Sequence, residues 1–125
     1  MKNRNLLKVL LLLFILISVS NLSYAQFQGP GVADKTYSVK EIIDNASRLD
    51  RSDALVKVQG YIVKQINADT YEFKDSTGNI LVDIDKKKLP TRPFDDKSEL
   101  ILIGEVDNNL LGPVEIEVKE VIFVN

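Results

Sequence analysis

The sequence predicts an all-β fold, a small five-stranded barrel preceded by one α-helix. Apolar and polar residues alternate with a period of two over most of residues 54–125, and turn residues separate the alternating runs at short intervals. Two of the runs carry an internal glycine, Gly60 and Gly104, as expected where a strand of a small barrel bends. Closure is favoured over an open sheet because it removes exposed strand edges. An SH3-like barrel and a helix-packed meander are the alternatives.

The first 25 residues have the pattern of a cleavable export signal. They begin with a short basic segment, continue as an apolar stretch over 6–17 that only Lys8 interrupts, and end on Ser-Tyr-Ala at 23–25, a small-x-small cleavage pattern. The apolar stretch is shorter than the roughly 20 residues that span a membrane. We therefore expect cleavage, a mature chain that begins at Gln26, and no stable membrane insertion afterwards; an uncleaved N-terminal anchor is the alternative.

Composition excludes several classes of function. The chain has 16 basic and 18 acidic residues, and loss of the three basic residues of the signal leaves 13 against 18, a net charge of −5. A net-acidic domain is a poor binder of nucleic acid, because that affinity depends on clustered Lys and Arg. The chain has no Cys and no His, which excludes disulfides, thiol chemistry, an imidazole base and metal sites built on these residues. We expect no enzymatic activity, no cofactor and no dedicated metal site.

The mature chain is expected to begin with a flexible leader over 26–37, followed by one helix. Gly and Pro residues and the lack of apolar periodicity mark the leader. Ser38 and Glu41 form a capping-box pattern, in which two side chains satisfy backbone N–H groups at the helix start. Apolar residues then follow at helical spacing, which predicts a helix from Val39 to Ser47 and a charged turn over 50–53.

Five strands account for the rest of the domain, 38–125. The first should turn Val56, Val58 and Ile62 inward and the intervening side chains outward. By the same parity, Tyr71 and Phe73 of the second strand should be core residues rather than a stacking platform for nucleic acid. The third strand, over 80–85, completes a hairpin. A loop with a short helical turn fills 86–97, and strands over 99–106 and 114–124 follow, the apolar end of the last one buried.

Several segments taken together resemble the bacterial OB-fold family of exported stress-tolerance proteins. They are Phe27–Gly31, Val58–Gln65, Tyr71–Gly78, Ile80–Asp85 and Gly104–Asp107. The resemblance implies a periplasmic five-stranded OB barrel with a preceding helix, linked to tolerance of envelope or chemical stress, and it supplies no catalytic motif. The turn at 108–112 departs from the aromatic-rich turn that members often have there, so the resemblance does not assign a binding role to this loop.

The candidate ligand-binding residues are polar side chains on the outward face of the first three strands. OB barrels generally bind oligonucleotides and oligosaccharides on one strand face and its flanking loops. The predicted site consists of Lys57, Gln59, Tyr61, Lys74 and Asp83, with Glu72 on the same face. Tyr61 would stack on a ring of the ligand, while Lys74 and Asp83 would bind its polar groups. The alternative is an ordinary solvated face with cross-strand charge pairs.

The sequence leaves two hypotheses about function. The first is a monomeric, non-catalytic binding module for a small molecule, a glycan fragment or an envelope protein. The second is a purely structural or protein-interaction domain that has no ligand pocket. A cation site at Asp83 and Asp85, joined by Asp95, Asp96 and Asp107, is disfavoured. The spacing fits no EF-hand loop, and three lysines, 86–88, directly follow the first pair.

Overall fold

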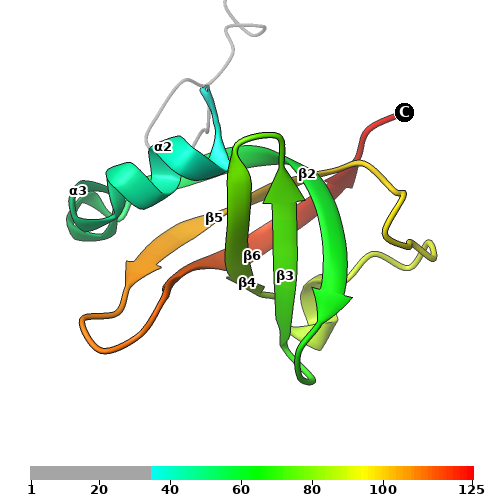
Figure 1. Cartoon of the computed structure of the whole chain (residues 1–125). Coiled ribbons are helices and arrows are strands. Elements are labelled where there is room, and N and C mark those ends of the chain that lie inside the picture. The colour runs from blue at the N-terminus through cyan, green and yellow to red at the C-terminus, as the bar shows by residue number, and fades with distance from the viewer. Residues whose placement is uncertain (1–34) are drawn as a thin grey trace, which may run out of the picture. The chain divides into compact units, whose positions relative to one another are not determined.

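The computed structural model describes residues 35–125, so the expected signal peptide and leader residues 26–34 lie outside the described residues. Two helices and six strands make up this part of the chain, together with one short 3-10 turn (Figure 1). In chain order the elements are β1 (Thr36–Tyr37), α2 (Val39–Asp44), α3 (Ala46–Ser52), β2 (Leu55–Gln65), β3 (Thr70–Asp75), β4 (Gly78–Asp83), η2 (Lys86–Lys88), β5 (Leu100–Asn108) and β6 (Val114–Phe123).

The strands pair in the order β1-β2-β3-β4-β6-β5, and an additional pairing of β2 with β5 closes the strands other than β1 into a ring. The five long strands therefore form a ring of hydrogen-bonded neighbours, which confirms the predicted small barrel. Strand β2 contributes to closure by changing partner along its length. Residues 55–60 pair with β5, and residues from Tyr61 onward pair with β3.

Gly60 occupies the point where β2 changes partner. A Cβ atom at this position would overlap the carbonyl oxygen of Lys74 and lie 3.0 Å from the ring Cζ of Phe73. The glycine is therefore required by the close approach of the β3 backbone, where β2 leaves β5 and begins to pair with β3. The register irregularity of β2 itself lies two residues further on, between Ile62 and Lys64.

The core confirms the inward and outward faces predicted from the alternation. Its buried side chains include Val56, Val58, Ile62, Tyr71, Phe73, Ile80, Val82, Leu100, Leu102, Ile116 and Val118. Phe73 is fully buried and Tyr71 is 6% exposed, so neither ring is a surface platform. The expectation of a buried C-terminal end holds only in part. Val121 and Phe123 are partly buried against the core, whereas Ile122 is 37% exposed. The Arg92 guanidinium lies 4.3 Å from the Phe123 ring centre.

The predicted single helix is two short helices. Asn45, with φ −111° and ψ 17°, separates α2 from α3, and its side-chain amide donates to the Glu41 carbonyl at 2.8 Å. Helix α3 then continues to Ser52, so most of the expected charged turn is helical; only Asp53, with φ 50°, adopts a turn conformation. The charged residues at 50–53 suggested an exposed turn. Leu49, however, is 1% exposed and holds this second helix against the core.

The start of α2 is held by side chains from two places in the chain. The Ser38 hydroxyl accepts from the Glu41 N–H at 3.1 Å, which confirms that half of the predicted capping box. From the β3–β4 turn, the Asp75 carboxylate accepts from the Val39 N–H at 2.9 Å and the Thr77 hydroxyl accepts from the Lys40 N–H at 3.0 Å. The turn therefore satisfies two donors that a helix start leaves without partners.

Strand β1 was not anticipated, because two residues are too few to show alternation. Thr36 and Tyr37 pair in parallel with Lys57 and Val58 of β2. The Lys35 ammonium lies 4.6 Å from the Tyr37 ring centre and binds the Glu41 carboxylate at 2.8 Å. The last two residues of the expected leader are thus attached to the barrel.

Candidate ligand-binding groove

Two adjoining hollows meet at Tyr61, and we refer to them together as the Tyr61 groove. The larger, of about 550 Å³, lies between β2, β3 and the loop before β5; the other, of about 410 Å³, extends toward β1 and α2. Tyr61, Asp75 and Ser76 line both hollows. The larger hollow adds Val63, Lys74, Asp96 and Lys97, and the other adds Thr36, Tyr37, Ser38, Glu41, Gln59, Gly60 and Glu99.

Tyr61 and Val63 form the apolar part of the groove. Their side chains are 36% and 39% exposed, and Lys74 lies directly opposite Tyr61 across the β2–β3 pairing. The irregularity between Ile62 and Lys64 leaves Val63 without a direct cross-strand partner on the surface side of β2. An exposed aromatic ring beside an aliphatic side chain and a cation is a suitable platform for a flat, partly polar ligand.

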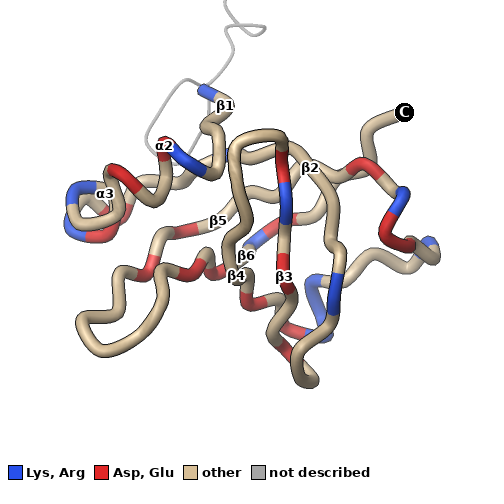
Figure 2. The backbone as a smooth tube through the Cα atoms, viewed as in Figure 1, with Lys and Arg blue, Asp and Glu red and all other residues tan. Residues whose placement is uncertain are grey.

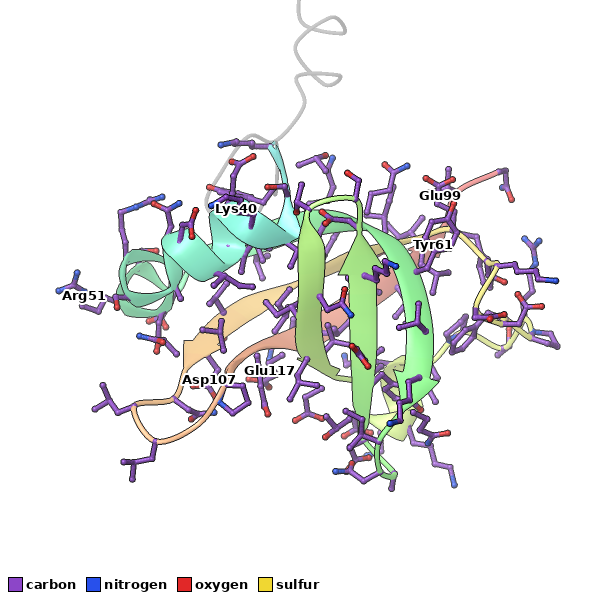
Figure 3. The ribbon with its side chains drawn as sticks, viewed as in Figure 1. Lys40, Arg51, Tyr61, Glu99, Asp107 and Glu117 are labelled. Atoms are coloured by element: carbon purple, nitrogen blue, oxygen red, sulfur yellow. The ribbon has the colours of Figure 1, made fainter. Side chains whose placement is uncertain are left out.

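Polar groups on the opposite side of Tyr61 are held in place by hydrogen bonds. The Gln59 amide donates to the Glu99 carboxylate at 2.7 Å, and Figure 3 shows Glu99 close to Tyr61 at the same end of the barrel. In the neighbouring loop, the Asp95 carboxylate accepts from the Lys97 N–H at 2.9 Å. That hydrogen bond lowers the pKa of Asp95 and orders the segment that carries the groove residues Asp96 and Lys97.

Asp75 lines both hollows, but its carboxylate is engaged in structural hydrogen bonds. One oxygen accepts from the Thr77 N–H, the Thr77 hydroxyl and the Gly78 N–H, and the other accepts from the Val39 N–H. Burial raises the pKa of Asp75, but these hydrogen bonds together outweigh it and hold the pKa below its ordinary value. We therefore assign Asp75 to the support of the groove rather than to ligand contact.

The structure brings three of the five predicted site residues together. Gln59, Tyr61 and Lys74 line the Tyr61 groove, whereas Lys57 lies further along β2, opposite Ile103, and lines neither hollow. Asp83 belongs to a separate hollow at the end of β4, with Asp69, Asp85 and Glu117. Glu72 lines a fourth hollow near Pro113, where its carboxylate accepts from the Asn79 amide at 2.6 Å.

The surroundings of Asp83 disfavour the ionised form of its side chain. Burial raises its pKa, and the neighbouring carboxylates of Asp69, Glu117 and Asp85 raise it further. A raised pKa in the folded state means that ionisation lowers stability, so the free energy of unfolding falls as pH rises through the folded-state pKa.

We expect Asp83→Asn to be more stable than the native protein at pH 7 and equal to it below the ordinary aspartate pKa of 3.8. Urea unfolding at pH 7 and pH 3 measures this; equal stabilities at pH 7 would contradict it.

Within residues 35–125, no three His, Cys, Asp or Glu side chains are grouped in a way that could hold a metal ion. In the same part of the chain, no helix is long and apolar enough to cross a membrane.

Comparison with known proteins identifies the family of this barrel. The model of the bacterial OB fold (BOF) protein family matches residues 20–123. The chain belongs to the BOF family. The BOF assignment confirms the resemblance that the sequence segments indicated.

Two BOF relatives are similar over most of the domain. The calcium-regulated OB-fold protein CarO of Pseudomonas aeruginosa is 40% identical over 99 residues, which cover 78% of this chain and 81% of CarO. Protein YgiW of Escherichia coli K12 is 40% identical over 83 residues, 66% of this chain and 62% of YgiW. The solved structure of YgiW superposes with a TM-score of 0.64 at 35% identity, covering 79% of this chain and all of that one. The OB fold is therefore shared.

Proposed function

We propose that this BOF protein is a non-catalytic periplasmic binding module that takes a small molecule or glycan fragment in the Tyr61 groove during envelope stress. The observation that carries the proposal is the exposed Tyr61 ring at the junction of two hollows, with Lys74 opposite it and the Gln59–Glu99 pair beside it. A ring to stack on, bordered by fixed donors and acceptors, is what a saccharide or a small heterocycle requires.

The net charge supports a glycan over a nucleic acid as the ligand. Residues lining the groove include the acidic groups Glu41, Asp96 and Glu99 as well as Lys74 and Lys97. Mixed charge with amide and carboxylate groups suits hydroxyl-rich ligands, whereas a phosphate backbone requires a predominantly basic surface. The alternative function, a structural domain with no ligand, predicts that the groove residues tolerate substitution.

Replacing Tyr61 by Ala tests the proposal. We expect oligosaccharide binding to weaken about 5- to 150-fold, because a stacked ring contributes about 1–3 kcal/mol in comparable aromatic contacts. The barrel should remain folded, since Tyr61 is outside the core. The measurement is titration of the protein with neutral and uronic-acid tetrasaccharides, and with oligo-dT as comparison, followed by amide chemical shifts.

Two control variants make that result specific to the groove. Tyr61→Phe keeps the ring and should retain most of the affinity, and Ile66→Ala changes an apolar side chain, 49% exposed, that does not line the groove. Shifts that are absent for both classes of tetrasaccharide, or unchanged in Tyr61→Ala, would refute the proposed site. An intact mass that corresponds to cleavage before Gln26, measured on protein from the periplasmic fraction, would support the proposed location; a mass that includes Met1 would contradict it.

A further inference from the structure

The tip of the β5–β6 hairpin presents two leucines entirely to solvent. Leu110 is 96% exposed and Leu111 is 103% exposed, compared with 36–49% for the other exposed large hydrophobic residues. Single exposed apolar side chains are ordinary on protein surfaces, but two adjacent leucines at full exposure form an apolar knob that has no packing role within residues 35–125. The β5–β6 hairpin projects from the barrel (Figure 1), and its residue Asp107 lies on the other side of the molecule from Tyr61 (Figure 3).

The stem behind this tip carries directly opposed carboxylates. Glu105 pairs with Glu117, and Asp107 pairs with Glu115 across the β5–β6 ladder. Figure 2 shows acidic residues on both strands of the hairpin, and no Lys or Arg occurs between Lys97 and Lys119 in the sequence. Like charges at directly opposed positions destabilise a sheet. Among residues 35–125, one ion pair relieves the stem, between Lys119 and Glu117 at 3.0 Å.

The hairpin is fastened to the domain just before the tip. The Asn108 N–H donates to the Asp50 carboxylate at 2.9 Å, and the Asn108 amide donates to the Ser47 hydroxyl at 3.0 Å. Both partners belong to α3, which packs on β5. The two leucines therefore extend from an anchored base, and little ordering is needed for the stem to engage a partner.

We propose that this hairpin, residues 105–117, is a docking arm for a cationic amphipathic polypeptide segment. The apolar face of such a segment would cover Leu110 and Leu111, while its Lys and Arg side chains would pair with Asp107, Glu115 and the carboxylates behind them. Charge complementarity selects this partner: pairing with cations turns the opposed carboxylates from a destabilising into a stabilising feature of the bound state. The arm is separate from the Tyr61 groove and does not depend on the function proposed for it.

Other occupants fit the arm less well. An anionic lipid surface would accept the leucines but repel the carboxylates next to them. A second copy of this chain, paired symmetrically through the arm, would bring two identical acidic stems together, and like charges across an interface are unfavourable. A cationic segment uses both the apolar tip and the acidic stem.

The test uses a fluorescein-labelled amphipathic helix of Leu and Lys as the probe, measured by anisotropy with protein purified from cells that express the full gene. We expect saturable binding that weakens at least tenfold in the double variant Leu110→Ser, Leu111→Ser, since two buried apolar side chains are lost. The double variant Asp107→Asn, Glu115→Gln should weaken binding and reduce its dependence on salt concentration.

Matched controls separate docking from general attraction to an acidic protein. The variant Asp44→Asn, Asp53→Asn removes the same number of charges elsewhere and should bind as the native protein does, as should Ile66→Ser, which changes another exposed apolar side chain. Equal affinity in the leucine variant, or equal binding of a Leu and Glu helix, would overturn the proposal. Leucine-dependent binding to anionic vesicles in place of the peptide, or leucine-dependent self-association in sedimentation, would overturn it in favour of a lipid or a second copy.

Discussion

Replacing Gly60 by Ala is expected to lower the free energy of unfolding by roughly 3 kcal/mol, the upper end of the effect of overpacking a core. The added Cβ would overlap the Lys74 carbonyl and press on the Phe73 ring, so β2 and β3 must separate where β2 leaves β5. Neither obstacle is the free end of a flexible side chain. Urea unfolding followed by circular dichroism measures the loss.

Two other glycines serve as comparisons for the Gly60→Ala prediction. A Cβ at Gly78 would meet nothing nearer than 3.7 Å, so Gly78→Ala should be nearly neutral. A Cβ at Gly104 would overlap the Glu117 carbonyl and lie 3.0 Å from Ile116 Cγ2, so Gly104→Ala should behave like Gly60→Ala. Equal stabilities of Gly60→Ala and Gly78→Ala would show that β2 and β3 do not approach as closely as described.

Replacing Asp75 by Ala should cost about 2 kcal/mol at pH 7, because three backbone N–H groups and one hydroxyl lose a charged acceptor. The loss affects the β3–β4 turn and the start of α2 together. Asp75→Asn should cost less, since an amide oxygen can still accept from Thr77. Thermal or urea unfolding of the three proteins at pH 7 gives the comparison.

The effect of Asp75→Ala should depend on pH in a defined direction. The folded-state pKa of Asp75 lies below its ordinary value of 3.8, so ionised Asp75 stabilises the fold above that value, and this contribution is lost as pH falls through the folded-state pKa. The stability difference between native and variant should therefore be full at pH 7 and shrink below pH 3.8. A difference that stays constant down to pH 2 would mean that the carboxylate charge is not what the turn and helix require.

Alternation predicted the barrel well because it reports directly on which side chains face inward. It assigned Val56, Phe73 and Val82 to the core, and all three are fully buried. It could not predict the break of the helix at Asn45, since the apolar stripe continues through Leu49 on the second helix. It also missed β1, whose two residues are held by parallel pairing with β2 and carry no periodic signal.

The candidate site was harder to predict. The alternation of residues shows which face of a strand a side chain is on, but it does not show how the sheet curves and which side chains the curvature brings together. Lys74 and Asp83 share the outward face, yet they line different hollows at different ends of the hairpin. Asp96, Lys97 and Glu99 enter the groove from a loop and strand start that fold back beside β2. No sequence pattern indicated that approach, although the Asp95-x-Lys97-Ser98 spacing was a readable turn signal.

Circular pairing has a consequence for how the chain tolerates truncation. Each strand of the ring is paired with two neighbours, each over part of its length, and β6 lies between β4 and β5. Loss of this final strand, through an early stop codon or proteolysis, would expose two unmatched edges at once. Such edges recruit strands from other molecules, so a shortened product should precipitate rather than persist as a weakened monomer.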